Sequence, residues 1–131
     1  MKVVLCHGVF DLLTLGHIRH LEKARTFGNR LIVSVVPDKF LTKRVPLYNE
    51  DERVAMLKAL RCVSNAILCE GPGPEKLIQR LVPDVYVRGG DYKSKRMPES
   101  DLLERLGIEV RCTESFPHRT SDIIARLMDK R

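Results

Sequence analysis

Residues 8–17, which read G-V-F-D-L-L-T-L-G-H, hold the side chains best suited to chemistry. Thr14 and His17 lie three residues apart at the start of a predicted helix, so both can face the same ligand. The free N–H groups and partial positive charge of a helix N-terminus favour an anion there. Gly8 would let the backbone approach a ligand closely, and Gly16 would allow tight packing at the helix entrance. This segment therefore predicts an anion-binding site.

The elements that must position this site alternate strictly between strand and helix. Short apolar runs predict buried strands, and apolar residues at helical spacing predict helices. Such alternation predicts a parallel sheet, with ligands bound at the carboxyl ends of its strands. We therefore expect a doubly wound α/β fold with five parallel strands and helices on both faces. The expected strands are 3–6, 31–36, 66–69, 84–87 and 108–112, and the expected helices are 18–25, 51–60, 75–81, 100–106 and 120–128.

The length and composition fit one domain over residues 1–131. No apolar run approaches the ~20 residues of a membrane span, and the N-terminus lacks a signal-peptide pattern, so we expect a cytoplasmic protein without a membrane partner. The four cysteines include no C-x-x-C pair and sit in or beside apolar runs, so we expect buried free thiols rather than a metal site.

The net charge of +6 has two interpretations. Nucleic acid attracts Lys and Arg, but so does a pocket for a triphosphate and a second phosphate. The basic residues are spread along the chain rather than gathered in a tail or one helix, which favours the small phosphorylated ligands over nucleic acid.

The motif at residues 8–17 resembles the signature G-x-F-D-x-x-[H/T]-x-G-H of the cytidylyltransferase-like nucleotidyltransferases. The resemblance implies a Rossmann-like fold, Mg²⁺ as cofactor and a homodimer. Most of the family has His at the position of Thr14. Thr at this position resembles the T-x-G-H string of the phosphopantetheine adenylyltransferase branch. His7 and His20 fall outside the motif. We expect His7 to be a strand-end residue and His20 to be exposed.

Three further segments resemble the family. The string L-T-K-R, with Lys43 and Arg44, is similar to a segment of bacterial heptose-1-phosphate adenylyltransferases, and Arg53 resembles an arginine of the family. The string P-D-V-Y-V-R-G-G-D-Y at residues 83–92 is similar to the P-D-x-x-V-K-G-G-D-Y of the same branch. Thr120 and Ser121 match the two hydroxyl positions of S-T-T-x-I, with Arg119 in place of the usual Ser.

The resemblance implies transfer of a nucleoside monophosphate from an NTP to a phosphorylated small molecule, with release of pyrophosphate. The resemblance also implies a role for each residue that matches a family motif. The implied catalytic residues are His17, Lys43 and Thr14; the implied nucleotide-binding residues are Gly8, Val9, Phe10, Asp11, Gly16, Arg88, Gly89, Asp91, Thr120 and Ser121; the implied substrate-binding residues are Arg44, Arg53 and Arg119. No protein side chain is expected to form a dedicated metal site, since Mg²⁺ would bridge phosphate oxygens.

The match at residues 83–92 and the lack of an R-T-E-G-I-S-T-T string favour ATP, with an acceptor such as heptose 1-phosphate. The first alternative is a CTP-dependent glycerol-3-phosphate or other alditol-phosphate cytidylyltransferase. An FMN adenylyltransferase and a non-catalytic nucleotide-binding domain remain further alternatives. A nicotinamide-binding Rossmann domain should show G-x-G-x-x-G after the first strand, which this chain lacks. An RNA-binding module should tolerate loss of His17 and bind in a salt-sensitive way.

Overall fold

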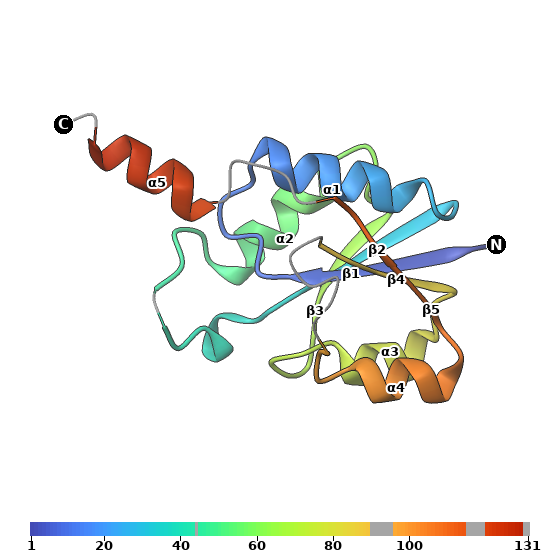
Figure 1. Ribbon diagram of the computed structural model, residues 1–131. Helices are drawn as coiled ribbons and strands as arrows, with labels where there is room; N and C mark the ends of the chain where they lie inside the picture. The colour runs from blue at the N-terminus through green and yellow to red at the C-terminus, as the bar shows by residue number, and fades with distance from the viewer. Residues whose placement is uncertain (44, 90–95, 115–119, 130–131) are drawn as a thin grey trace.

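Short runs of aliphatic residues build a sheet of five parallel strands in the order β3-β2-β1-β4-β5 (Figure 1). The computed structural model describes residues 1–43, 45–89, 96–114 and 120–129, with side chains of the last segment described from residue 125 onward. The predicted parallel sheet is confirmed. The strands are β1 (Val3–Gly8), β2 (Arg30–Val35), β3 (Asn65–Leu68), β4 (Val85–Arg88) and β5 (Glu109–Cys112).

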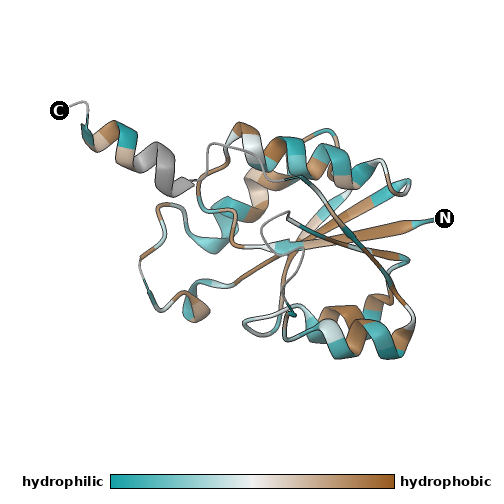
Figure 2. Cartoon of the chain, in the orientation of Figure 1, coloured by the Kyte–Doolittle hydropathy of each residue, from teal (hydrophilic) through white to brown (hydrophobic). Residues whose placement is uncertain are grey.

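Helices cover both faces of the sheet, as predicted. On one face Leu21 of α1 and Leu57 of α2 join a buried cluster with residues of β1, β2, β3 and β4. On the other face Ile78 of α3 and Leu103 of α4 pack against alternate residues of the same strands. Figure 2 shows hydrophobic colour concentrated along the strands between these layers. The helices are α1 (Leu15–Arg25), α2 (Glu50–Lys58), α3 (Glu75–Leu81), α4 (Ser100–Leu106) and α5 (Thr120–Asp129), with a 3₁₀ turn, η1, at Asp38–Phe40.

The strand order creates a topological switch point between β1 and β4. The chain moves outward from β1 through β2 to β3, then returns to the other side of β1 with β4 and β5. The connections that leave β1 and β4 therefore diverge, and this is where open α/β sheets bind ligands. The predicted motif at residues 8–17 and the segment at Arg88 lie at this switch point.

Two elements differ from the sequence prediction. Asp38–Phe40, for which no helix or strand was predicted, forms a 3₁₀ turn. Strand β5 was expected to be covered on both faces, but Glu109, Val110 and Arg111 are exposed because β5 lies at the edge of the sheet. Figure 1 shows α5 extending away from the layered body, and its residues from 125 to 129 are exposed. Among the described residues, no helix is both long and apolar enough to cross a membrane.

All four cysteines are free, as predicted. Cys6 and Cys69 are buried, and Cys62 and Cys112 are partly buried. Burial raises the pKa of the Cys6 thiol far above its usual range, so Cys6 stays protonated and behaves as an apolar core residue.

Candidate nucleotide-binding site

The entrance of α1 is built by a reciprocal capping box between Thr14 and His17. The Thr14 hydroxyl oxygen accepts a hydrogen bond from the His17 amide at 3.3 Å, and the Thr14 amide donates to Nδ1 of His17 at 3.1 Å. A capping box usually pairs Ser or Thr with Glu or Gln, and here an imidazole takes the carboxylate's place. The capping box therefore orients the ring of His17 as well as starting the helix.

The capping box also defines the protonation pattern of His17. Because Nδ1 accepts the Thr14 N–H, the neutral ring carries its proton on Nε2. Burial lowers the pKa of His17, and a hydrogen bond with the Leu12 backbone partly opposes that effect. The ring is therefore neutral near pH 7, with Nε2–H as its hydrogen-bond donor. His17 can donate to a phosphate oxygen but does not supply a full positive charge there.

Phe10 supports the ring of His17 from inside the protein. Its ring meets that of His17 edge to face, with centroids 5.7 Å apart, and Phe10 is buried. The backbone of Phe10 has φ 52°, in the left-handed region, which is strained for a side-chain-bearing residue. A Cβ added at Gly8 would lie 2.8 Å from the Phe10 ring. Gly8 therefore makes room for Phe10, rather than only for a ligand as the sequence suggested.

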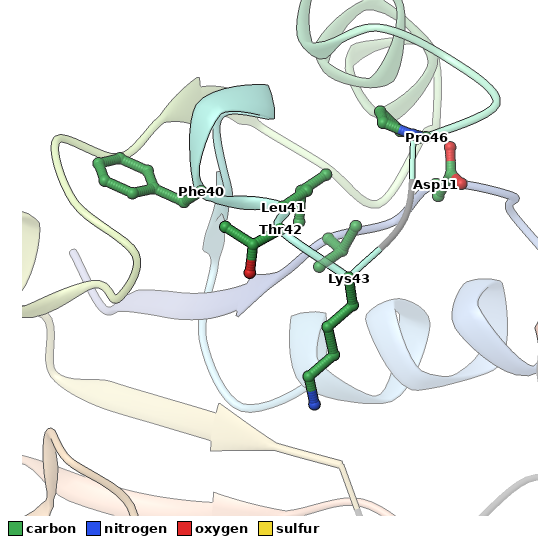
Figure 3. Close-up of a pocket in the computed structure, with 7 residues that line it drawn as sticks. Asp11, Phe40, Leu41, Thr42, Lys43 and Pro46 are labelled. Carbon is green, nitrogen blue, oxygen red and sulfur yellow. The ribbon is translucent and has the colours of Figure 1, made fainter.

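A pocket of about 290 Å³ lies between the loop after β1 and the loop after β2 (Figure 3). Lys43 is exposed at this pocket, and Figure 3 shows its side chain extending away from Asp11. Among the described lining residues, apolar side chains lie beside the Lys43 cation, a combination that suits a ligand with a phosphate on an uncharged body. The pocket thus brings three of the predicted site residues together, Val9, Asp11 and Lys43. Its lining residues are Val9, Asp11, Phe40, Leu41, Thr42, Lys43 and Pro46.

Asp11 anchors the loop that carries Lys43. Its two carboxylate oxygens accept the amides of Leu47 and Tyr48, at 3.0 and 3.1 Å. Asp11 is only 4% exposed. Its observed partners are loop amides 36 and 37 residues away, so it shapes the wall of the pocket.

Arg53 is buried beneath the loops that follow β1 and β2. We expected it to bind substrate, but its side chain is 0% exposed. Its guanidinium donates to the carbonyls of Tyr48 and Val9, at 3.1 and 2.8 Å, and to Oδ1 of Asp38 at 2.7 Å. A buried charge needs partners of this kind, because losing water is costly. In this structure Arg53 therefore contacts the protein's own loops, and contact between Arg53 and substrate stays a prediction.

The carboxyl end of β4 forms the other side of the switch point. Arg88 donates from Nη2 to the Ser100 hydroxyl at 2.9 Å, and its guanidinium lies 5.9 Å from the centre of the Tyr86 ring. Tyr86 in turn donates to the buried Glu99 at 2.9 Å. Among the residues that the structure describes, none comes within 4 Å of a Cβ built on Gly89.

The two histidines outside the motif are both partly buried. His20 was expected to be exposed, and this prediction is wrong: its Nδ1 lies 2.7 Å from the hydroxyl of Thr113, just after β5. Burial, together with the nearby His17, lowers the pKa of His20 to about 4. His7 is a strand-end residue, as predicted, with Nδ1 2.6 Å from the Ser34 hydroxyl. Burial lowers its pKa, although Glu99 opposes the shift.

The remaining predicted residues divide into two groups. Thr120 and Ser121 start α5, as the sequence indicated, but their side chains are outside the described part of the structure. The structure brings together Thr14, His17, Phe10 and Gly8. That the start of α5 binds the same nucleotide as this group stays a prediction. Gly16 lies in the first turn of α1. Arg44, Asp91 and Arg119 lie outside the described residues.

The described side chains near the site include no ready-made set of metal ligands. Within the described ranges, no group of three His, Cys, Asp or Glu side chains is arranged to hold one. Asp11, the nearest carboxylate of the motif, already accepts two amides. This donor set fits an ion held mainly by phosphate oxygens and water, which is how Mg²⁺ is commonly bound with nucleotides.

The fold and the site together define an α/β domain of the nucleotidyltransferase class. The chain belongs to the cytidylyltransferase-like family, whose model matches residues 5–126. The predicted Rossmann-like fold and enzyme class are confirmed by this match.

Curated relatives include two proteins named "Bifunctional protein HldE". The one from Syntrophotalea carbinolica is 35% identical over 133 residues, covering 98% of this chain and 27% of the relative. The one from Azotobacter vinelandii is 39% identical over 114 residues, covering 84% of this chain and 24% of the relative. This chain therefore spans about a quarter of the length of these relatives.

A similar solved structure is the lipopolysaccharide core biosynthesis protein from Thermoplasma volcanium. It matches with a TM-score of 0.73 and 29% sequence identity, and the match covers 91% of this chain and 99% of that one. The likeness therefore extends over most of this chain.

Proposed function

We propose that this domain transfers a nucleoside monophosphate, AMP from ATP, to a phosphorylated sugar such as heptose 1-phosphate, and releases pyrophosphate. The observation that carries the proposal is the capped His17, with its Nε2–H donor, at a switch point flanked by the pocket of Lys43. The relatives named HldE and the lipopolysaccharide core biosynthesis protein support a sugar-phosphate acceptor.

In the proposed reaction, an anionic oxygen of the acceptor's phosphate attacks the α-phosphorus of the NTP. A new oxygen–phosphorus bond forms as the bond from the α-phosphorus to the bridging oxygen breaks, and pyrophosphate leaves with that electron pair. The attacking oxygen is already ionised near neutral pH, so the step needs no general base. The protein's contribution is positioning and stabilisation of the developing charge.

His17 has the clearest role. Its Nε2–H would donate to a phosphate oxygen, which is a stronger acceptor than a backbone carbonyl such as that of Leu12. Thr14 is 5% exposed, and its hydroxyl oxygen already accepts the His17 amide, so it acts mainly by positioning the imidazole. Lys43 would offset negative charge near the pocket, and the entrance of α5 at Thr120 and Ser121 would bind the β- and γ-phosphates.

Mg²⁺ would neutralise phosphate charge when bound with the nucleotide, held mostly by phosphate oxygens and water. Arg88 and Gly89, at the end of β4, are proposed to lie beside the base and ribose together with Asp91. We retain the homodimer predicted from the family as part of this proposal.

The choice of ATP rests on the sequence match at residues 83–92 and on the lack of the cytidylyltransferase string before α5. A CTP-dependent enzyme acting on glycerol 3-phosphate or another alditol phosphate is the second candidate. The family match and the motif at residues 8–17 are compatible with CTP as well as with ATP. An FMN adenylyltransferase and a non-catalytic nucleotide-binding domain are the remaining alternatives.

A pyrophosphate-release assay tests the proposal. The purified protein is incubated with Mg²⁺, with ATP or CTP, and with single acceptors drawn from sugar 1-phosphates, alditol phosphates and FMN. We expect release with ATP and a sugar 1-phosphate, and no release when the acceptor is omitted. Release only with CTP would replace the proposed substrate pair. Nucleotide binding without release for any acceptor would favour the non-catalytic alternative.

A further inference from the structure

We infer that Asp11, Asp38 and Arg53 form a clasp that holds Lys43 in its working position, and that these three are positioning residues. The inference rests on the proposed function for the role of Lys43 in catalysis. The clasp itself is defined by hydrogen bonds that join the loop after β1, the loop after β2 and the start of α2.

The clasp closes the base of the Lys43 loop. Asp38 and Glu50 bond reciprocally: the Asp38 amide donates to Oε1 of Glu50 at 2.9 Å, and the Glu50 amide donates to Oδ2 of Asp38 at 3.1 Å. Arg53 donates to the remaining carboxylate oxygen of Asp38 at 2.7 Å. The residues between Asp38 and Glu50 therefore form a loop whose two ends are fastened to each other.

The same clasp fastens this loop to the motif after β1. Arg53 donates to the Val9 carbonyl, and Asp11 accepts two amides from the exit of the loop, at Leu47 and Tyr48. These bonds join residues 36 to 44 positions apart in the chain. The distance from the Lys43 loop to the motif of Phe10 and His17 is therefore set by the clasp.

The exposed fractions of these residues agree with a positioning role for Asp11 and Arg53 and a ligand-facing role for Lys43. Thr42 and Lys43 are exposed, and Val45 is 90% exposed, whereas Arg53 is 0% and Asp11 is 4% exposed. A side chain at the tip of a loop can be held in place only through the loop's base. The buried residues thus govern where Lys43 lies, and Lys43 itself faces the pocket.

A double-mutant cycle tests whether Asp11 acts through Lys43. Asp11→Asn replaces one carboxylate oxygen by an NH₂ group, which cannot accept the amide it faces. We expect kcat to fall about 10-fold, the size of one lost hydrogen bond of about 1.4 kcal/mol, with little change in KM for the nucleotide. In a Lys43→Ala background the same substitution should change kcat by no more than about twofold. Asp51→Asn, at an exposed carboxylate in the first turn of α2 and outside the clasp, is the matched control and should leave kcat unchanged.

A second readout does not depend on activity. Trypsin cleaves after Lys43, and a loosened loop should be cut several-fold faster in Asp11→Asn than in the Asp51→Asn control, at equal circular dichroism. Asp38→Asn, which removes the charge that faces Arg53 but can keep an amide oxygen as the acceptor, should give the same pattern and serves if Asp11→Asn does not fold.

The outcomes separate the clasp from the proposed reaction. An Asp11→Asn effect on kcat that persists in full in the Lys43→Ala background would overturn the clasp, because Asp11 would then act on the substrate directly. If the wild-type protein shows no transferase activity, faster cleavage in Asp11→Asn supports the clasp while the proposed function fails. Cleavage at the same rate as in Asp51→Asn overturns the clasp whatever the activity.

Discussion

The entrance of α1 and the loop that carries Lys43 flank the same motif but are held by different devices. At α1, Thr14 and His17 cap each other across three residues. At the Lys43 loop, Asp11 and Arg53 bond to residues up to 44 positions away. The capping box can form together with its helix, because its residues are close in sequence. The hydrogen bonds of Asp11 and Arg53 form only once distant parts of the chain have come together. We therefore expect the α1 entrance to be the more robust half of the site.

The two halves also differ in the charge they offer. His17 is neutral near pH 7, because burial lowers its pKa, and it contributes a directed hydrogen bond. Lys43 contributes a full charge from an exposed loop, where water weakens its effect. In the proposed reaction, the directed hydrogen bond of His17 and the charge of Lys43 would stabilise the same transferring phosphate in complementary ways.

Replacing His17 by Ala should have the largest effect. The substitution removes the Nε2–H donor and half of the capping box, so we expect kcat to fall at least ~100-fold, the scale of losing one preorganised donor. Steady-state pyrophosphate release measures this. Unchanged turnover would remove His17 from the mechanism and leave the Lys43 loop as the sole active half.

Replacing Lys43 by Ala should have the next largest effect. Loss of a charge near the leaving group should lower kcat about 30-fold, or about 2 kcal/mol, which is less than the full Coulomb energy because the side chain is exposed. The decrease should shrink as salt is added to both proteins, since salt screens exposed charges. Lys43→Arg, which keeps the charge, is the control; equal loss in both variants would show that charge is not what Lys43 supplies.

Replacing Thr14 should separate capping from catalysis. Thr14→Ala removes the hydroxyl that accepts the His17 amide, and we expect a loss of about 1 kcal/mol in the free energy of unfolding. Because the ring of His17 loses part of its support, kcat should fall about 10-fold. Thr14→Ser keeps the hydroxyl and should restore both quantities. A stable Thr14→Ala variant with full activity would contradict the positioning role given to this residue.

The smallest effect should come from His20, which joins α1 to the end of β5. Its folded pKa of about 4 lies below the usual value of 6.5, so below about pH 6.5 the unfolded chain binds more protons than the folded one. Stability should be fully present above pH 6.5 and fall as pH decreases toward 4. Urea midpoints measured at pH 7 and pH 5 should therefore differ more in the wild type than in His20→Gln. An equal difference in both would show that His20 does not titrate with folding.

Much of the fold could be predicted because it follows from local patterns. The bounds of α3 and α4 match the predicted helices, since apolar spacing and flanking Gly and Pro residues mark both. The switch point could also be predicted, because alternating strands and helices leave few topologies. The role of Phe10 beneath His17 could not, since its left-handed backbone and the close approach to Gly8 have no periodic signature.

The burial of Arg53 and His20, which the sequence analysis did not predict, has one physical cause. Arg53 and His20 owe their burial to partners far away in the chain: Val9 lies 44 residues from Arg53, and Thr113 lies 93 residues from His20. A weak local signal did exist, because Arg53 lies one helical turn before the buried Leu57, and His20 one turn before the buried Ala24. A polar residue within an apolar helical stripe indicates a buried hydrogen-bonding position.

The most direct test of the account is ¹⁵N NMR of the His17 imidazole, with and without Mg²⁺ and an ATP analogue whose α,β-bridging oxygen is a methylene. The capping box predicts a neutral ring protonated on Nε2 at pH 7, and a shift of the Nε2–H resonance when the nucleotide binds. A ring protonated on Nδ1, or an Nε2–H resonance that stays unchanged while the nucleotide is bound, would contradict the claim that the α1 entrance holds the triphosphate.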